Sequence, residues 1–175
     1  MLKSMFAKPR KLETESQLHE AAMRLLMRRG YSISEMKKAL ARRCDDPKLI
    51  RSVLDGLKEA KHIDDARYAK QFTRSRTESR KQGPYRIARD LRARGVPDQH
   101  IEAALKDAAV EGDPAALIRH RIARKMKLLR GEIDERKVAS LYRSLLAAGF
   151  PSDLIRKELY KLTHQEIPDS LSESE

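Results

Sequence analysis

Hydrophobic residues recur at intervals of three and four along most of the chain, which is the spacing of one face of an α-helix. In the N-terminal third this pattern predicts three helices, over residues 16–29, 32–43 and from 46 onward. Ser32 and Glu35 match a capping box, in which side chains satisfy the first amide protons of a helix. The predicted buried residues are Leu18, Ala21, Ala22, Leu25, Leu26, Met36, Leu40, Ile50, Val53, Leu54 and Leu57.

The central third has the same plan. Asp64-Asp65 supplies a carboxylate at a helix N-cap position. Gly83-Pro84 begins a second helix, because the N–H groups of the first turn have no partner within the helix and proline lacks this N–H. Gly95 ends that helix, and a third helix follows. The predicted inward residues are Ala66, Ala69 and Phe72, with Tyr68 alongside, then Ile87, Ala88 and Leu91, and finally Ile101, Ala104 and Leu105.

One spacing, L-x(9)-I-x(3)-L, occurs in three places, which is typical of a tandem repeat. Its members are Leu40, Ile50 and Leu54, then Leu91, Ile101 and Leu105 at an offset of 51, then Leu145, Ile155 and Leu159 at a further offset of 54. The last copy opens at Asp113-Pro114, breaks at Gly131 and restarts at Asp134. We therefore predict an all-α protein of three tandem three-helix repeats in an elongated, solenoid-like body; a single compact bundle is the alternative.

These patterns divide the chain into five parts. They are a flexible basic lead over 1–15, repeats over 16–62, 63–111 and 112–164, and an acidic, disordered tail over 165–175. Each repeat carries a basic block with a net charge of +6, over 24–43, 74–94 and 119–130, within a total of +12. A solvated surface of ordinary composition mixes both signs, so grouped charge indicates a polyanionic partner or an acidic protein surface.

The centre of the chain also carries a recognisable motif. It is made of Asp64-Asp65, Tyr68-Ala69, Phe72, Arg76, Lys81, Gly83-Pro84, Arg86-Ile87, Leu91 and Gly95-Val96. This run resembles the central signature of the RecX family, and the resemblance extends over roughly residues 16 to 163. It implies an all-helical regulator that binds the filament of the RecA recombinase on single-stranded DNA and inhibits recombinase activity, in recombinational repair and the SOS response.

Other features limit the chemistry and the compartment. A lone Cys44 excludes an intramolecular disulfide and fits a reducing compartment, and no apolar run has the length of a signal peptide or a membrane span. We expect a cytoplasmic monomer. No glycine-rich phosphate loop occurs, the five histidines share no ligand spacing, and Asp64-Asp65 is explained by helix capping. We therefore expect no enzymatic activity, no metal and no cofactor.

The candidate contacts with RecA or DNA are the basic residues of the second and third blocks and one tyrosine. They are Arg74, Arg76, Arg80, Lys81, Tyr85, Arg86, Arg89, Arg92, Arg119, Arg121, Arg124, Lys125, Lys127 and Arg130. Arginine forks onto phosphate or carboxylate, so these residues fit the DNA backbone, an acidic face of RecA, or both. Tyr85 either stacks on a base or packs between helices.

Two other functions fit parts of the sequence. Gly95 and Gly149 precede Ile101 and Ile155 by six residues, a spacing typical of a helix-turn-helix, so a DNA- or RNA-binding regulator is the first alternative. The small residue expected four positions before the glycine is a leucine in both places, which weighs against it. A scaffold that binds only protein is the second alternative.

Overall fold

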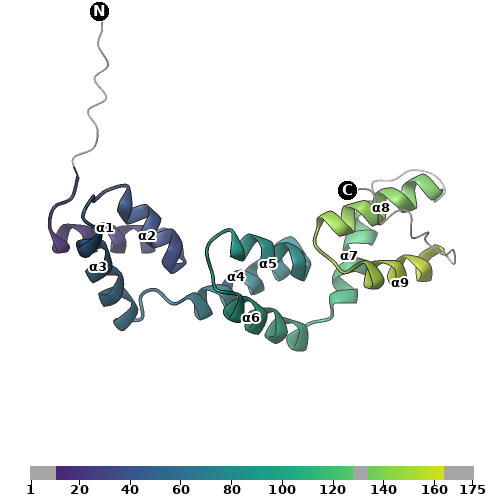
Figure 1. Ribbon diagram of the computed structural model, residues 1–175. Helices are drawn as coiled ribbons and strands as arrows, with labels where there is room; N and C mark the ends of the chain where they lie inside the picture. The colour runs from purple at the N-terminus through teal and green to yellow at the C-terminus, as the bar shows by residue number, and fades with distance from the viewer. Residues whose placement is uncertain (1–10, 128–133, 164–175) are drawn as a thin grey trace, which may run out of the picture. The chain divides into compact units, whose positions relative to one another are not determined.

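The computed structural model describes residues 11–127 and 134–163, and within these residues every regular element is a helix (Figure 1). The helices are α1 (Glu15–Leu26), α2 (Ile33–Ala41), α3 (Pro47–Glu59), α4 (Asp65–Arg80), α5 (Pro84–Arg92), α6 (Asp98–Glu111), α7 (Pro114–Met126), α8 (Glu135–Ala147) and α9 (Ser152–Thr163). The prediction of an all-α protein built from three-helix repeats is confirmed. Gly131 and the acidic tail lie outside the described residues.

The helices start where the sequence places their caps. The Ser32 side chain accepts a hydrogen bond from Glu35 N, and the Glu35 carboxylate accepts one from Ser32 N, so the predicted capping box is present. Asp46, Asp113 and Asp134 each accept a hydrogen bond from an amide in the first turn of the following helix. These carboxylates satisfy donors that have no partner inside the helix, and they lie at the positive end of the helix dipole.

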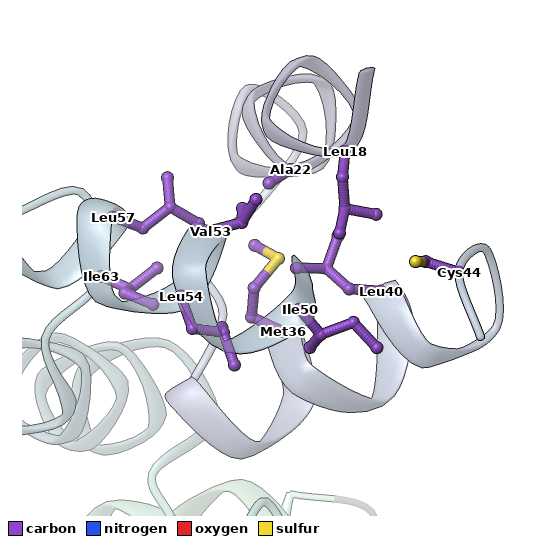
Figure 2. Close-up of a cluster of buried hydrophobic side chains, with 10 residues drawn as sticks. All are labelled: Leu18, Ala22, Met36, Leu40, Cys44, Ile50, Val53, Leu54, Leu57 and Ile63. Atoms are coloured by element: carbon purple, nitrogen blue, oxygen red, sulfur yellow. The ribbon is translucent and has the colours of Figure 1, made fainter. Parts of the chain in front are cut away.

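The first core lies among α1, α2 and α3 (Figure 2). Leu18 of α1, Leu40 of α2 and Leu57 of α3 are among its fully buried side chains, and Cys44 is buried at its edge. A second core, among α7, α8 and α9, includes Tyr142, Leu145 and Ile155. The matched leucines Leu40, Leu91 and Leu145 and the matched isoleucines Ile50, Ile101 and Ile155 are all buried, so the repeat pattern identifies equivalent core positions.

The chain divides into two compact units, and the division does not follow the repeat boundaries. The first unit comprises residues 1–68 with 94–97, and the second comprises 69–93 with 98–175. The turn between α5 and α6 thus belongs with the first repeat, whereas α5 and α6 belong with the third. The boundaries expected at 62/63 and 111/112 lie between helices, and we retain them as proposed limits of the repeats.

In each repeat, the carbonyl group three residues after the matched leucine accepts a hydrogen bond. The donor belongs to a segment that comes before that repeat in the sequence. Arg94 O accepts from Ser32 Oγ at 2.6 Å, and Ala148 O accepts from Gly83 N at 2.8 Å. In the first repeat, Arg43 O accepts from Leu12 N at 2.7 Å, so the N-terminal segment takes the place of a preceding repeat. The predicted lead over 1–15 is thus bonded to the first repeat at Leu12, and its flexibility stays a prediction for the residues outside those described.

Two glycines make these junctions close. Gly95 and Gly149 have φ of +71° and +88°, in the left-handed region that favours glycine. A Cβ on Gly95 would collide with the Ser34 side chain, and a Cβ on Gly149 would collide with the backbone of Arg86. Both glycines therefore combine a helix-ending conformation with a tight contact to the start of an earlier helix.

The inward face of α4 differs from the expected one. Ala66 is exposed, Phe72 is half-buried, and the buried residues are Asp65, Ala69 and Thr73, so the buried positions share Ala69 with the predicted set but recur every four residues instead of every three. Asp65 faces inward because its carboxylate accepts a hydrogen bond from Ile33 N at 2.9 Å, at the start of α2. Asp64, in contrast, accepts from Arg67 N and is the expected helix cap.

Candidate functional site

A pocket of about 640 Å³ opens in the second unit, where the end of α4 meets α7 and α8. Five of its lining residues belong to the sequence-predicted set, namely Arg80, Lys81, Arg121, Arg124 and Lys125. The remaining lining residues are Ser79, His120, Ile122, Leu141, Ser144 and Leu145. The fold therefore brings together basic residues that lie about forty positions apart in the sequence. We call this the basic pocket.

Arg121 anchors the basic pocket. One guanidinium nitrogen, Nη1, donates to Arg80 O at 2.9 Å and to Lys81 O at 3.0 Å. These carbonyls lie at the end of α4, where carbonyl groups have no partner within the helix, so the cation complements the negative end of the helix dipole. Lys81 has φ of +49°, which is uncommon for a residue with a side chain. The left-handed turn and Arg121 together fix the rim of the pocket.

Among the residues that the structure describes, no carboxylate lines the basic pocket. Partial burial, followed by the positive charges of Arg124 and Arg86, lowers the pKa of the Arg121 guanidinium below its ordinary value. Lys125 Nζ is oriented by Ser140, donating to its carbonyl at 3.2 Å. The lining is thus a group of cations held near one another by neutral hydrogen-bond acceptors.

A second pocket in the same unit, of about 290 Å³, differs from the basic pocket in the charge balance of its lining. It is lined by Lys70 and Arg74 but also by Glu78, Asp107 and Glu111. Lys70 pairs with Asp107 at 3.2 Å, and Arg74 pairs with Glu78 at 2.8 Å. Its cations are therefore balanced within the protein, whereas those of the basic pocket are not balanced by its lining.

Several other predicted contact residues have structural roles. Arg92 pairs with Asp98 at 2.6 Å. Arg119 pairs with Asp113 at 2.9 Å and with Glu158 at 3.2 Å, and Glu158 is buried. Lys161 also pairs with Glu158, at 2.6 Å. Hydrogen bonds from Lys161, the largest cause, and from Arg119 hold the pKa of the Glu158 carboxyl below its ordinary value, against the opposing effect of burial.

Arg86 does not lie on an open solvent face. Its side chain is half-buried, Nη1 donates to Ala147 O at 3.1 Å, and its backbone is in close contact with Gly149. Arg86 is therefore only partly accessible to a partner, whereas Arg89, also in the predicted contact set, is exposed. Arg86 secures the junction between α5 and the turn that follows α8.

The remaining predicted residues are separate from the basic pocket lining. Tyr85 is 64% exposed, so of its two readings the packed one is wrong and the stacking one stays a prediction. Arg76 lies with its guanidinium carbon 4.8 Å from the centre of the Phe72 ring. Lys127 is exposed at the end of α7, and Arg130 lies outside the described residues.

Sequence reasoning missed three polar residues of the basic pocket, Ser79, His120 and Ser144. None belongs to a motif, and only the packing of α4 against α7 and α8 brings them together. It also missed the cluster around Glu35, whose carboxylate pairs with Arg29 at 3.1 Å and accepts from the Tyr68 hydroxyl at 3.2 Å. The position of Glu35 in a capping box indicated its local role but not these longer contacts.

Over 11–127 and 134–163, no helix is long and apolar enough to cross a membrane. In the same residues, no group of three or more histidine, cysteine or acidic side chains is arranged to hold a metal ion.

Comparison with known proteins gives a consistent result. A family profile described as RecX, second three-helix domain, matches residues 64–105. The protein named Regulatory protein RecX of Halorhodospira halophila is 39% identical over 140 residues, which cover 79% of this chain and 84% of that one. The protein of the same name from Prosthecochloris aestuarii is 34% identical over 134 residues, or 77% and 85% of the two chains.

The fold has solved relatives as well. The crystal structure of RecX from Lactobacillus salivarius superposes with a TM-score of 0.71, at 21% identity, and covers 86% of this chain and 97% of that chain. A second crystal structure, of regulatory protein RecX, gives a TM-score of 0.72 over 87% of this chain and 72% of that chain. At 21% sequence identity, these two similarities show that the fold is shared.

Proposed function

The chain belongs to the RecX family of regulatory proteins, and from this we propose that it binds the RecA filament on single-stranded DNA and inhibits recombinase activity. The role falls in recombinational repair and the SOS response. The observation that carries the proposal is the basic pocket, because cations that no described lining residue balances can pair with a polyanion. The exposed Arg89 and Tyr85 add to the same unit's contact surface.

Repetition strengthens such binding. A filament presents the same site many times, and a protein with several basic repeats can engage more than one site at once. Linked modules of modest affinity then bind far more tightly together than alone, by factors of about 10² to 10⁴. On this account the protein acts in the cytoplasm as a monomer, by binding and without catalysis, metal or cofactor.

The proposal is tested by measuring ATP turnover by RecA on single-stranded DNA as the purified protein is added. We expect turnover and strand exchange to fall with increasing protein, and the protein to sediment with the filament. The protein alone should hydrolyse no nucleotide and cleave no DNA. Unchanged RecA activity at saturating protein, with no co-sedimentation, would overturn the proposal.

The spacing between Gly95 and Ile101 favours a second candidate, a helix-turn-helix regulator that reads duplex DNA. In that arrangement α6 would enter the major groove. However, α6 carries four acidic residues and one lysine, a net charge of −3, which phosphate groups would repel. A duplex sequence bound at least 10³-fold more tightly than random duplex would favour this candidate. A protein-only scaffold would bind neither strand form.

A further inference from the structure

The basic pocket has a composition that suggests what fills it. Six of its lining side chains are basic or histidine, two are serines, and three are aliphatic. Arginine N–H groups and hydroxyls are common donors to phosphate oxygens. We propose that this pocket binds consecutive phosphate groups of a single strand of nucleic acid. The inference rests on the proposed function and deepens it, because it assigns the DNA contact to this pocket.

The geometry of Arg121 supports this assignment. Its Nη1 is already used by two carbonyls, at 2.9 Å and 3.0 Å, so the guanidinium is held in one orientation before any ligand arrives. A pre-oriented cation loses little conformational entropy on binding. Arg124 is exposed beside it, and the Lys125 amine is placed by Ser140, so three cations of one helix border the same space.

The charge balance points to a ligand with several negative charges. Partial burial, and after it the positive charges of Arg124 and Arg86, lower the pKa of Arg121, so neighbouring cations add to the effect of burial at this group. An anion placed here would stabilise several cations at once, whereas a single carboxylate side chain could neutralise only one. A strand of nucleic acid supplies a charge at every nucleotide, which matches this requirement.

An acidic protein segment is the competing occupant, and the lining disfavours it. Protein interfaces are usually centred on exposed apolar or aromatic anchors that become buried. The large exposed apolar residues among those described are Met27, Tyr85, Val110, Tyr160 and Leu162, and none of them lines the pocket. The aliphatic residues that do line it, Ile122, Leu141 and Leu145, are buried in the second core.

The test compares two double variants that remove the same charge from the same unit. Arg124→Gln with Lys125→Gln removes two cations of the basic pocket. Lys70→Gln with Arg74→Gln removes two cations that are paired with Asp107 and Glu78. Binding of a fluorescent 20-nucleotide poly-dT strand, and of an abasic strand of equal length, is measured by anisotropy from 0.05 to 0.5 M salt. Circular dichroism checks that both variants are folded.

We expect the basic-pocket variant to bind both strands more weakly. Each lost phosphate contact should reduce the slope of log K against log salt by about 0.7, so the slope should fall by about 1.4. A slope change of about 1.4 means that the loss of affinity in the variant is roughly 25-fold greater at 0.1 M salt than at 1 M salt. The paired-cation control should change affinity less than about threefold. Equal losses in the two variants, or an unchanged slope in the pocket variant, would overturn the proposal.

Two further arms separate the possible sources of phosphate. A nucleoside triphosphate at millimolar concentration should displace the strand only weakly, and complete displacement would overturn the assignment to a strand. An acidic peptide of ten glutamates should compete no better than the triphosphate; tighter competition would assign the pocket to a protein. If the pocket variant loses strand binding but still inhibits RecA fully, the proposed function stands. If wild-type protein binds the strand and leaves RecA active, the proposed function fails alone.

Discussion

The hydroxyl of Ser32 donates a 2.6 Å hydrogen bond to the carbonyl of Arg94, a residue 62 positions later in the chain. The same hydroxyl accepts a hydrogen bond from Glu35 N at 3.1 Å, so one buried side chain both caps α2 and holds the turn before α6. Gly83, which begins α5 as Ser32 begins α2, makes the equivalent contact with Ala148 O through its backbone N–H. A local capping signal therefore also marks a junction between repeats.

Replacing Ser32 with alanine should destabilise the protein more than removing an ordinary cap. The variant loses the α2 cap and leaves the Arg94 carbonyl without this donor, for a total of about 2–3 kcal/mol. The matched control is Thr14→Ala, since Thr14 caps α1 by accepting from Gln17 N and should cost only about 1 kcal/mol. Urea unfolding measures both. Equal losses in the two variants would show that the Arg94 contact contributes nothing.

Replacing Gly149 with alanine should disrupt the junction between α5 and the α8–α9 turn. The variant would place a Cβ against the Arg86 backbone and force alanine into φ of +88°, so we expect a loss of more than about 2 kcal/mol. Gly56→Ala is the control with the opposite sign. Gly56 lies inside α3 with open space at the Cβ position, so alanine should stabilise the protein by about 0.5–1 kcal/mol. Thermal unfolding that ranks the two variants in the reverse order would contradict this reading.

Glu158 should make stability depend on pH in the acid range. Its pKa is lowered in the folded protein, chiefly by the hydrogen bond from Lys161, so its stabilising effect is present above the ordinary glutamate pKa. The effect is lost as pH falls through the lower folded value. Glu158→Gln should therefore reduce stability at pH 7 and weaken the acid dependence below about pH 4.5. Urea unfolding from pH 7 to pH 3 measures this, with the exposed Glu102→Gln as control. If the stability of the variant depends on pH as that of wild type does, Glu158 does not contribute to the acid dependence.

Local rules predicted the helices well and their junctions poorly. The caps at Ser32, Asp46 and Asp113 follow from residue types and short spacings, and Leu40, Leu91 and Leu145 occupy equivalent core positions because packing repeats with the sequence. Asp65 could not be placed in this way. Its burial depends on an amide 32 positions earlier, and nothing in its neighbours indicates that contact.

The same difference between local signals and long-range contacts applies to the candidate site. The basic blocks are visible in the sequence, but charge alone cannot separate Arg119, which is paired with two carboxylates, from Arg124, which lines the basic pocket. The two residues lie in one helix, five positions apart, on different faces. Which partner each one finds depends on how α7 packs against α9 and the end of α4, and no motif encodes that packing.

If basic residues of the second unit bind the RecA filament, replacing them should weaken binding more than removing the basic N-terminal residues. Filament affinity is measured across a salt series for two variants. One carries Arg89→Glu, Arg124→Glu and Lys125→Glu, and the other lacks residues 2–10, which include the basic Lys3, Lys8 and Arg10. We predict that the triple variant remains folded, binds the filament at least tenfold more weakly at 0.1 M salt and loses inhibition, while the deletion changes affinity less than threefold. A deletion that weakens binding more than the triple variant does would contradict the claim.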